Sequence, residues 1–147
     1  MARTNGRLNI DIETKQFYSK IKNKYSSLRL TNSQLFSLAL TMGYYKGIKK
    51  PLNKKMGFIR HETIPTDLFS VIMLVCMDEY GVNDDEWIDN PLILLDLAEE
   101  YANAGIRMLM ELMDNYDSTL DEFLSLTILE LYNDIDFELL HEKFLSK

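Results

Sequence analysis

Cysteine, histidine and proline are scarce in this 147-residue chain, which has one, two and three of them respectively. A single cysteine cannot form an intramolecular disulfide, which suits a reducing compartment. That residue, Cys76, lies in the apolar run 68–77, so we interpret it as a small core side chain rather than a nucleophile. One Trp and three Pro against eight Met and eight Tyr indicate helices with adaptable packing rather than a turn-rich β protein.

The sequence also lacks the residue spacings of common catalytic and metal sites. His61 and His141 are far apart and form neither an H-x-x-x-H nor an H-E-x-x-H pattern. The glycines near residues 43–47 are not followed by the G-K-[ST] of a phosphate-binding loop. Adjacent acids such as Glu99 and Glu100 diverge on a helix, and we interpret them as solvated. We therefore predict a protein that is not an enzyme, with no catalytic residue, metal ligand or cofactor.

Long apolar runs are absent as well. The longest nearly unbroken run has about ten residues, half of what a membrane-spanning helix requires. The first residues do not include the apolar segment of a secretory signal. We expect a cytoplasmic protein that makes no contact with a membrane.

Charge is plentiful, and it is divided unevenly along the chain. Residues 1–61 contain 13 of the 16 Lys and Arg and only two acids, Asp11 and Glu13, for a net charge of +11. Residues 62–147 contain three basic and 21 acidic residues, for a net charge of −18. We predict one domain over 1–147, with a basic strand–helix–helix–loop part (1–61) and an acidic helical body (62–147). Such asymmetry suggests that one part faces a polyanion and the other a different partner.

The basic part begins with an alternating pattern, which predicts a strand. The pattern places Leu8, Ile10 and Ile12 on a buried face and Arg7, Asn9 and Asp11 on an exposed face. A helical period starts at Glu13, and Thr31 with Gln34 forms a capping box before a helix over 32–46. Residues 47–65 are predicted to form a long basic loop.

The acidic part is predicted to be entirely helical. A helix over 67–80 is apolar on almost all sides, so we expect it to be central. A second helix over 91–114 has an apolar stripe with small residues for close packing. A capping box at 118–121 and a last helix at 134–146 follow. The fold class is mainly α: a compact bundle of about five to six helices with one short N-terminal β-strand.

The N-terminal part resembles the ribbon-helix-helix DNA-binding family. The resemblance rests on the strand 7–12, the helix from Glu13, the break at 28–30 and the capped helix that starts Thr31-Asn32-Ser33. In that family the strands of two chains pair into a ribbon that enters the major groove. The resemblance implies that Arg7, Asn9 and Asp11 face bases and that Asn32 and Ser33 contact phosphate. The alternative is a short strand that covers a helical core.

A second resemblance covers about half of the chain. Residues 40–52 read Leu-x-x-Gly-Tyr-x-x-Gly-x-x-x-Pro-Leu, and residues 100–105 read Glu-Tyr-Ala-Asn-x-Gly. In this order and spacing they resemble the small proteins associated with DNA phosphorothioation, which are encoded beside DNA-sulfur modification and restriction genes. The resemblance implies an accessory protein of a defence system that acts near DNA. Its motifs are structural, and it implies no catalytic residue.

From these patterns we expect DNA, duplex or single-stranded, to bind the basic half. The acidic helices are expected to bind a defence-system protein or a second copy of the chain. The predicted nucleic-acid-binding residues are Arg7, Asn9, Lys20, Lys24, Asn32, Ser33, Lys46, Lys49, Lys50, Lys54, Lys55 and Arg60. Tyr44, Tyr45 and Phe58 lie between the loop lysines and are either base-stacking residues or core. Two alternatives stay open: a ribbon-helix-helix-like transcriptional regulator, and a protein–protein adaptor that does not contact DNA.

Overall fold

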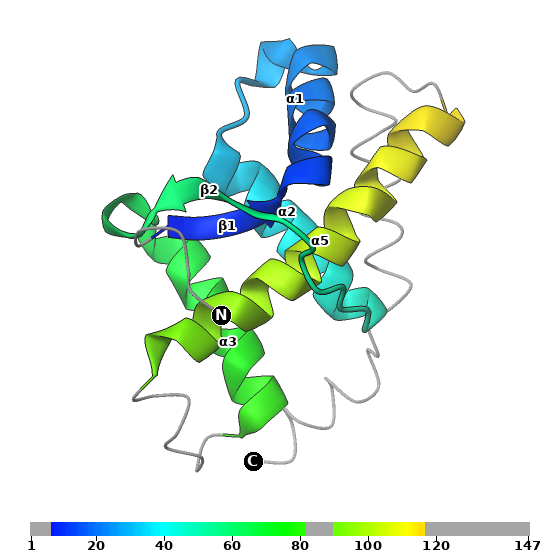
Figure 1. Cartoon of the computed structure of the whole chain (residues 1–147). Helices are drawn as coiled ribbons and strands as arrows, with labels where there is room; N and C mark the ends of the chain where they lie inside the picture. The colour runs from blue at the N-terminus through cyan, green and yellow to red at the C-terminus, as the bar shows by residue number, and fades with distance from the viewer. Residues whose placement is uncertain (1–6, 82–89, 117–147) are drawn as a thin grey trace, which may run out of the picture.

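A computed structural model of the chain describes residues 7–81 and 90–116, which form four α-helices and a two-stranded antiparallel sheet (Figure 1). The elements are β1 (Arg7–Asp11), α1 (Lys15–Lys24), α2 (Asn32–Lys46), β2 (Lys55–Arg60), α3 (Thr66–Tyr80) and α5 (Pro91–Tyr116). The fold is mainly helical, as predicted. The expectation of five to six helices is not met by these residues, and the helices expected over 118–146 lie outside them.

The central helix is α5, not α3. Every residue of α5 from Leu97 to Ile106 is buried except Glu100, because the other elements surround this stretch. The apolar composition of α3 had predicted that α3 would be central, and this prediction was wrong. Leu74 and Phe69 of α3 are 64% and 45% exposed, so part of its apolar surface is not covered by the other described elements. Composition alone does not distinguish a surrounded helix from one with an uncovered face.

Helices α2 and α5 cross in direct backbone contact. A Cβ atom on Gly105 would lie 1.7 Å from the carbonyl oxygen of Ala39, and one on Gly43 would lie 2.0 Å from that of Tyr101. Only glycine fits at these two positions. The crossing joins the 40–52 and 100–105 segments, and Nδ2 of Asn103 donates to the carbonyl oxygens of Lys50 (3.1 Å) and Pro51 (3.3 Å). The structural role expected of these two motifs is thus observed.

The expected basic loop contains a strand. Residues 55–60 form β2, which pairs with β1 so that Arg7 faces Arg60 and Asp11 faces Lys55, with an irregularity between Leu8 and Asn9. The prediction of an unstructured 47–65 loop was wrong because the partner strand lies more than 40 residues away, which local patterns do not reveal. Figure 1 shows the two-stranded ribbon formed by β1 and β2 between α1 at one end of the molecule and α3 at the other.

One hydrophobic core joins the basic and acidic parts of the chain. It contains Leu8 and Ile10 of β1, Leu35 and Phe36 of α2, and Ile106 of α5, all at most 3% exposed. The charge boundary at residue 61 is therefore not a structural boundary. No helix among the described residues is long and apolar enough to cross a membrane.

Candidate nucleic-acid interface

Helix α1 presents positive charge to solvent. Its sequence, KQFYSKIKNK, has four lysines and no acid. Lys15, Lys20 and Lys24 are exposed, whereas the half-buried Lys22 donates from Nζ to Oδ1 of Asn32, and burial lowers its pKa. The opposite side of α1 is anchored by Tyr18 and Ile21, which are almost fully buried. The helix therefore presents a fixed cationic face to solvent.

Tyr18 holds α1 on the ribbon. Its ring centroid lies 4.6 Å from that of Phe58 of β2, and its hydroxyl has no hydrogen-bond partner. Burial raises the pKa of this hydroxyl strongly, so it stays neutral. Thr14, which precedes α1, donates from Oγ1 to the carbonyl oxygen of Asp11 at 2.9 Å. Phe58 is thus partly buried and packs against Tyr18.

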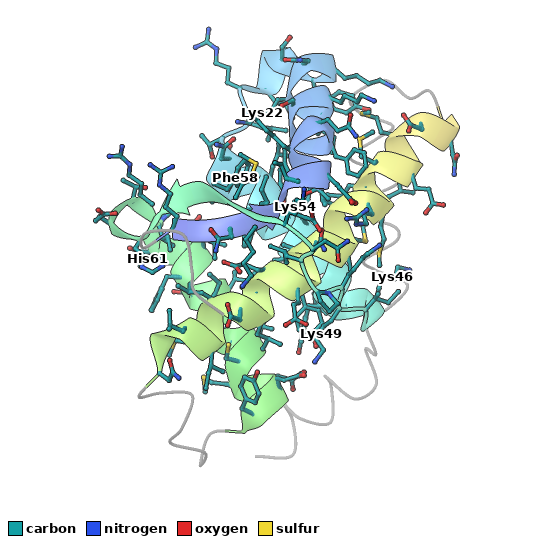
Figure 2. The ribbon with its side chains drawn as sticks, viewed as in Figure 1. Lys22, Lys46, Lys49, Lys54, Phe58 and His61 are labelled. Carbon is teal, nitrogen blue, oxygen red and sulfur yellow. The ribbon has the colours of Figure 1, made fainter. Side chains whose placement is uncertain are left out.

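Three further exposed cations lie on or next to the two strands. Arg7 and Arg60 are exposed and face each other across the two strands, so like charges are neighbours here. Lys54 is exposed beside the start of α1, where its carbonyl oxygen accepts from the amide of Ile12 at 2.8 Å. Figure 2 shows Lys54 near the base of α1, whereas Lys46 and Lys49 lie near the end of α2. The predicted cations therefore do not form one patch.

Two of the predicted lysines pair with acids of the same chain. Nζ of Lys49 lies 2.7 Å from Oε1 of Glu79. Nζ of Lys55 lies 3.4 Å from Oδ1 of Asp96 and 3.7 Å from Oε1 of Glu99, and the Lys55 side chain is only 15% exposed. The basic loop thus faces the acidic helices, which neutralise part of its charge. Lys46 is half-buried and Lys50 is exposed.

Asn9 and Asp11 do not face solvent, which corrects the predicted exposed face of the strand. Both are fully buried, and α5 packs against β1. The backbone amide of Asn9 donates to Oε2 of Glu99 at 2.7 Å. Asn9 is therefore not accessible to a nucleic acid in this structure. The next residue in the pattern, Ile12, lies outside the strand and is 51% exposed rather than buried.

A buried polar cluster takes the place of that exposed face. Asp11 accepts from the amide of Asn53 at 3.0 Å and lies 3.8 Å from Nη2 of Arg107. Glu99, expected to be solvated, is 2% exposed because it points toward β1 and β2. Sequence reasoning missed this cluster. The sequence signal was weak, because within one helical turn Glu99 adjoins Asp96, Glu100 and Asn103 as well as Leu95, Ala98 and Ala102.

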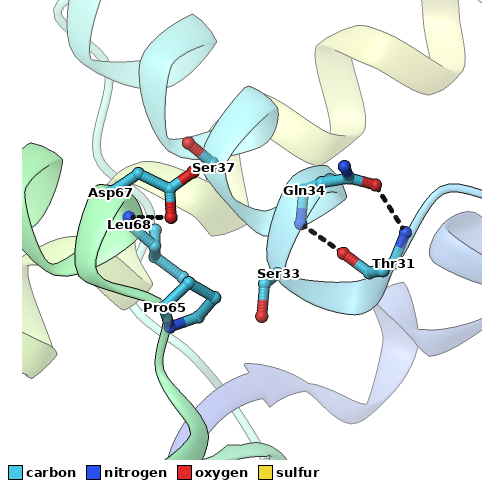
Figure 3. Close-up of a pocket in the computed structure, with 7 residues that line it drawn as sticks. All are labelled: Thr31, Ser33, Gln34, Ser37, Pro65, Asp67 and Leu68. Atoms are coloured by element: carbon cyan, nitrogen blue, oxygen red, sulfur yellow. Dashed lines mark hydrogen bonds between the residues drawn. The ribbon is translucent and has the colours of Figure 1, made fainter.

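The start of α2 borders a cavity of about 400 Å³ between the first turns of α2 and α3 (Figure 3). The predicted capping box is present: Thr31 accepts from the amide of Gln34 at 3.1 Å, and Gln34 accepts from that of Thr31 at 2.9 Å. Ser33 lines the cavity, and so does Asp67. Because Asp67 already supplies a negative charge, the cavity is a poor place for phosphate.

Tyr44 and Tyr101 connect α2, α3 and α5. Tyr44 donates to Asp78, and Tyr101 donates to Oε2 of Glu79 at 2.9 Å, with the two rings edge to face at 5.7 Å. Burial raises the pKa of both hydroxyls, that of Tyr101 to about 12. The hydrogen bond from Lys49 is the main cause that lowers the pKa of Glu79. Tyr44 is thus a structural residue.

The cysteine of the chain, Cys76, is buried. Burial raises the pKa of the Cys76 thiol to about 11, so this thiol is protonated at neutral pH. Within residues 7–81 and 90–116, no three His, Cys, Asp or Glu side chains are placed to hold a metal ion. We found no match to this chain among protein-family models, curated proteins or solved structures.

Proposed function

We propose that the protein is a non-catalytic accessory protein that binds DNA through the lysine face of α1, with Arg7, Arg60 and Lys54 as flanking contacts. The observation that carries this proposal is the contrast between two sets of cations. Lys49 and Lys55, which face the acidic helices, pair with acids of the same chain, whereas α1 has no acid of its own and exposes Lys15 and Lys20.

Two features of the charge on α1 are unfavourable when nothing is bound. Lys20 and Lys24 are four residues apart, and like charges at that spacing cost about 0.2–0.5 kcal/mol. Lys15 lies at the N-terminal end of the helix, where the helix dipole disfavours a cation. A polyanion such as DNA relieves both effects, because its phosphates place negative charge beside these lysines. Each phosphate contact also releases about 0.9 counterion, which favours binding at low salt.

The resemblance of residues 40–52 and 100–105 to phosphorothioation-associated proteins supports a role in a DNA modification or restriction defence system. The acidic residues of the body then contact another defence-system protein or a second copy of the chain. The ribbon-helix-helix alternative is less favoured, because β1 pairs with β2 of its own chain and the Asn9 amide bonds to Glu99. A ribbon built from the β1 strands of two chains would require each β1 to give up its pairing with β2 and its bond to Glu99.

The test is a salt titration of binding to a labelled 20-base-pair duplex with two charge-matched variants. Lys20→Glu/Lys24→Glu changes α1, and Lys46→Glu/Lys50→Glu changes the end of α2 by the same net charge. We expect the α1 variant to bind more weakly and its log–log salt slope to fall by about 2, since two phosphate contacts are lost. The control variant should retain most of the affinity.

Equal losses in the two variants would contradict the assignment to α1, since net charge alone would then explain binding. No binding of the native protein at low salt would contradict the DNA proposal and leave the protein–protein adaptor. Charge reversal at Lys55 is unsuitable as a test, because it would place a third carboxylate beside Asp96 and Glu99.

A further inference from the structure

The exposed face of α1 carries neutral hydrogen-bonding side chains between its lysines. A shallow groove of about 490 Å³ runs along this face, and its lining includes Lys15, Gln16, Ser19, Lys20 and Asn23. All five of these residues are exposed. The only acid of the groove is Glu13, which lies 3.5 Å from Nη2 of Arg107. Negative charge on this face is thus minor and already paired.

The helical period places the two amides at the centre of the face. Gln16 and Asn23 are seven residues apart, so about two turns bring them to nearly the same angular position and about 10 Å apart along the axis. Ser19 lies between them, toward the side of Lys15. Lys15 and Lys24 project near the two edges. The face therefore has amides at its centre and cations along its edges. This arrangement is expected of a helix in the major groove, where the base edges lie opposite the centre of the helix and the phosphates lie on either side.

We infer that α1 reads base edges in the major groove of duplex DNA, with Gln16 and Asn23 contacting adenines about three base pairs apart. The inference rests on the proposed DNA binding and adds sequence recognition to it. Asn and Gln side chains pair in a bidentate manner with N6 and N7 of adenine, and the major groove is about 12 Å wide, which admits a helix. An axial separation of about 10 Å corresponds to about three steps of 3.4 Å.

The position of α1 suits entry into a groove. Figure 1 shows α1 at one end of the molecule, so its exposed face is not enclosed by the other described elements. Its buried side is fixed by Tyr18, Ile21 and Tyr25 in the core, which holds the reading face in a defined orientation. The next helix in the chain, α2, begins at the Thr31 capping box.

Duplex DNA fits this face better than other nucleic acids. Single-stranded sites use exposed aromatic rings for stacking, and the aromatic residues of α1 are half-buried (Phe17) or buried (Tyr18). The major groove of duplex RNA is deep and narrow, so side chains on a helix do not reach the bases.

The experiment begins with selection of bound sequences from a pool of random duplexes by the full chain, at a salt concentration where binding is measurable. Affinities for the selected duplex and a scrambled duplex are then compared for the native protein, Gln16→Ala and Asn23→Ala. Asn115→Ala is the matched control, because it removes an exposed amide that lies outside α1, at the C-terminal end of α5. Each α1 variant should lose roughly 5- to 150-fold of discrimination.

Because these substitutions are neutral, the salt slope and the affinity for the scrambled duplex should not change. Binding without an enriched sequence, or discrimination that survives both α1 substitutions, would overturn this inference and leave the proposed DNA binding intact. A complete absence of duplex binding at low salt would overturn the proposed function itself. Loss of discrimination in Asn115→Ala to the same degree would also contradict the assignment to α1.

Discussion

The close crossing of α2 and α5 makes Gly105→Ala the sharpest test of this fold. The added Cβ would lie 1.7 Å from the carbonyl oxygen of Ala39 and 2.9 Å from the amide nitrogen of Gly43. Both atoms belong to the backbone, so no side-chain rotation relieves the overlap. An ordinary contact begins at 3.4 Å, so the helices must separate by roughly 1.7 Å, enough to lose much of the dispersion energy at the crossing.

The expected cost follows from two opposing effects. Replacing Gly by Ala inside a helix would by itself stabilise the protein by about 1 kcal/mol. Overpacking a core typically costs about 1–3 kcal/mol, and it reaches the upper end or beyond when a backbone must move. We therefore expect a net loss of about 2 kcal/mol or more, a large part of the roughly 5–15 kcal/mol of a typical domain.

The assay is urea unfolding followed by circular dichroism, with the free energy of unfolding taken by linear extrapolation. Gly47→Ala is the matched control, because a Cβ atom at this position meets nothing within 4 Å. The substitution should cost only about 1–2 kcal/mol, since alanine disfavours the φ of +70° found here. Gly43→Ala should behave like Gly105→Ala, and the double variant should cost less than the sum, since one separation of the helices relieves both overlaps. A Gly105→Ala protein within 1 kcal/mol of the native protein would refute the direct crossing.

Two further predictions concern the charges that join the basic and acidic parts. Asp11→Ala should reduce the free energy of unfolding by about 2 kcal/mol, because it removes the buried acceptor of the Asn53 and Glu13 amides and leaves Arg107 without that partner. Glu79→Gln should cost at most about 1 kcal/mol at pH 7, since its ion pair with Lys49 is partly exposed. The lowered pKa of folded Glu79 means that its contribution is present above its unfolded pKa near 4.3 and is lost as pH falls through the folded pKa.

Denaturant unfolding over a range of pH measures both effects. The native and Glu79→Gln curves should converge as the pH falls from about 5 toward 3, and a constant offset would show that the hydrogen bond from Lys49 does not lower the pKa of Glu79. For Asp11, a variant as stable as the native protein would contradict the role of the buried polar cluster in joining β1 to α5.

Local interactions explain which predictions were correct. The capping box of Thr31 and Gln34 and the following helix depend on residues within one or two turns, so the bounds 32–46 agree with the structure. The pairing of β2 with β1 depends on contacts across more than 40 residues, and nothing local in Lys55–Arg60 requires a strand. The burial of Asn9 and Glu99 depends on where α5 lies, which the alternating pattern of β1 does not specify.

The sequence by itself determined the positions of the main helices, the strand at Arg7–Asp11 and the uneven division of charge, because composition and short-range periodicity are properties of the chain. The tertiary structure decided which charges remain available to a partner. Folding brings Lys49 and Lys55 against Glu79, Asp96 and Glu99, while α1 keeps its exposed lysines away from those acids. Net charge is additive along a sequence, but the field at a surface depends on the distances between charges, and only the fold sets those distances.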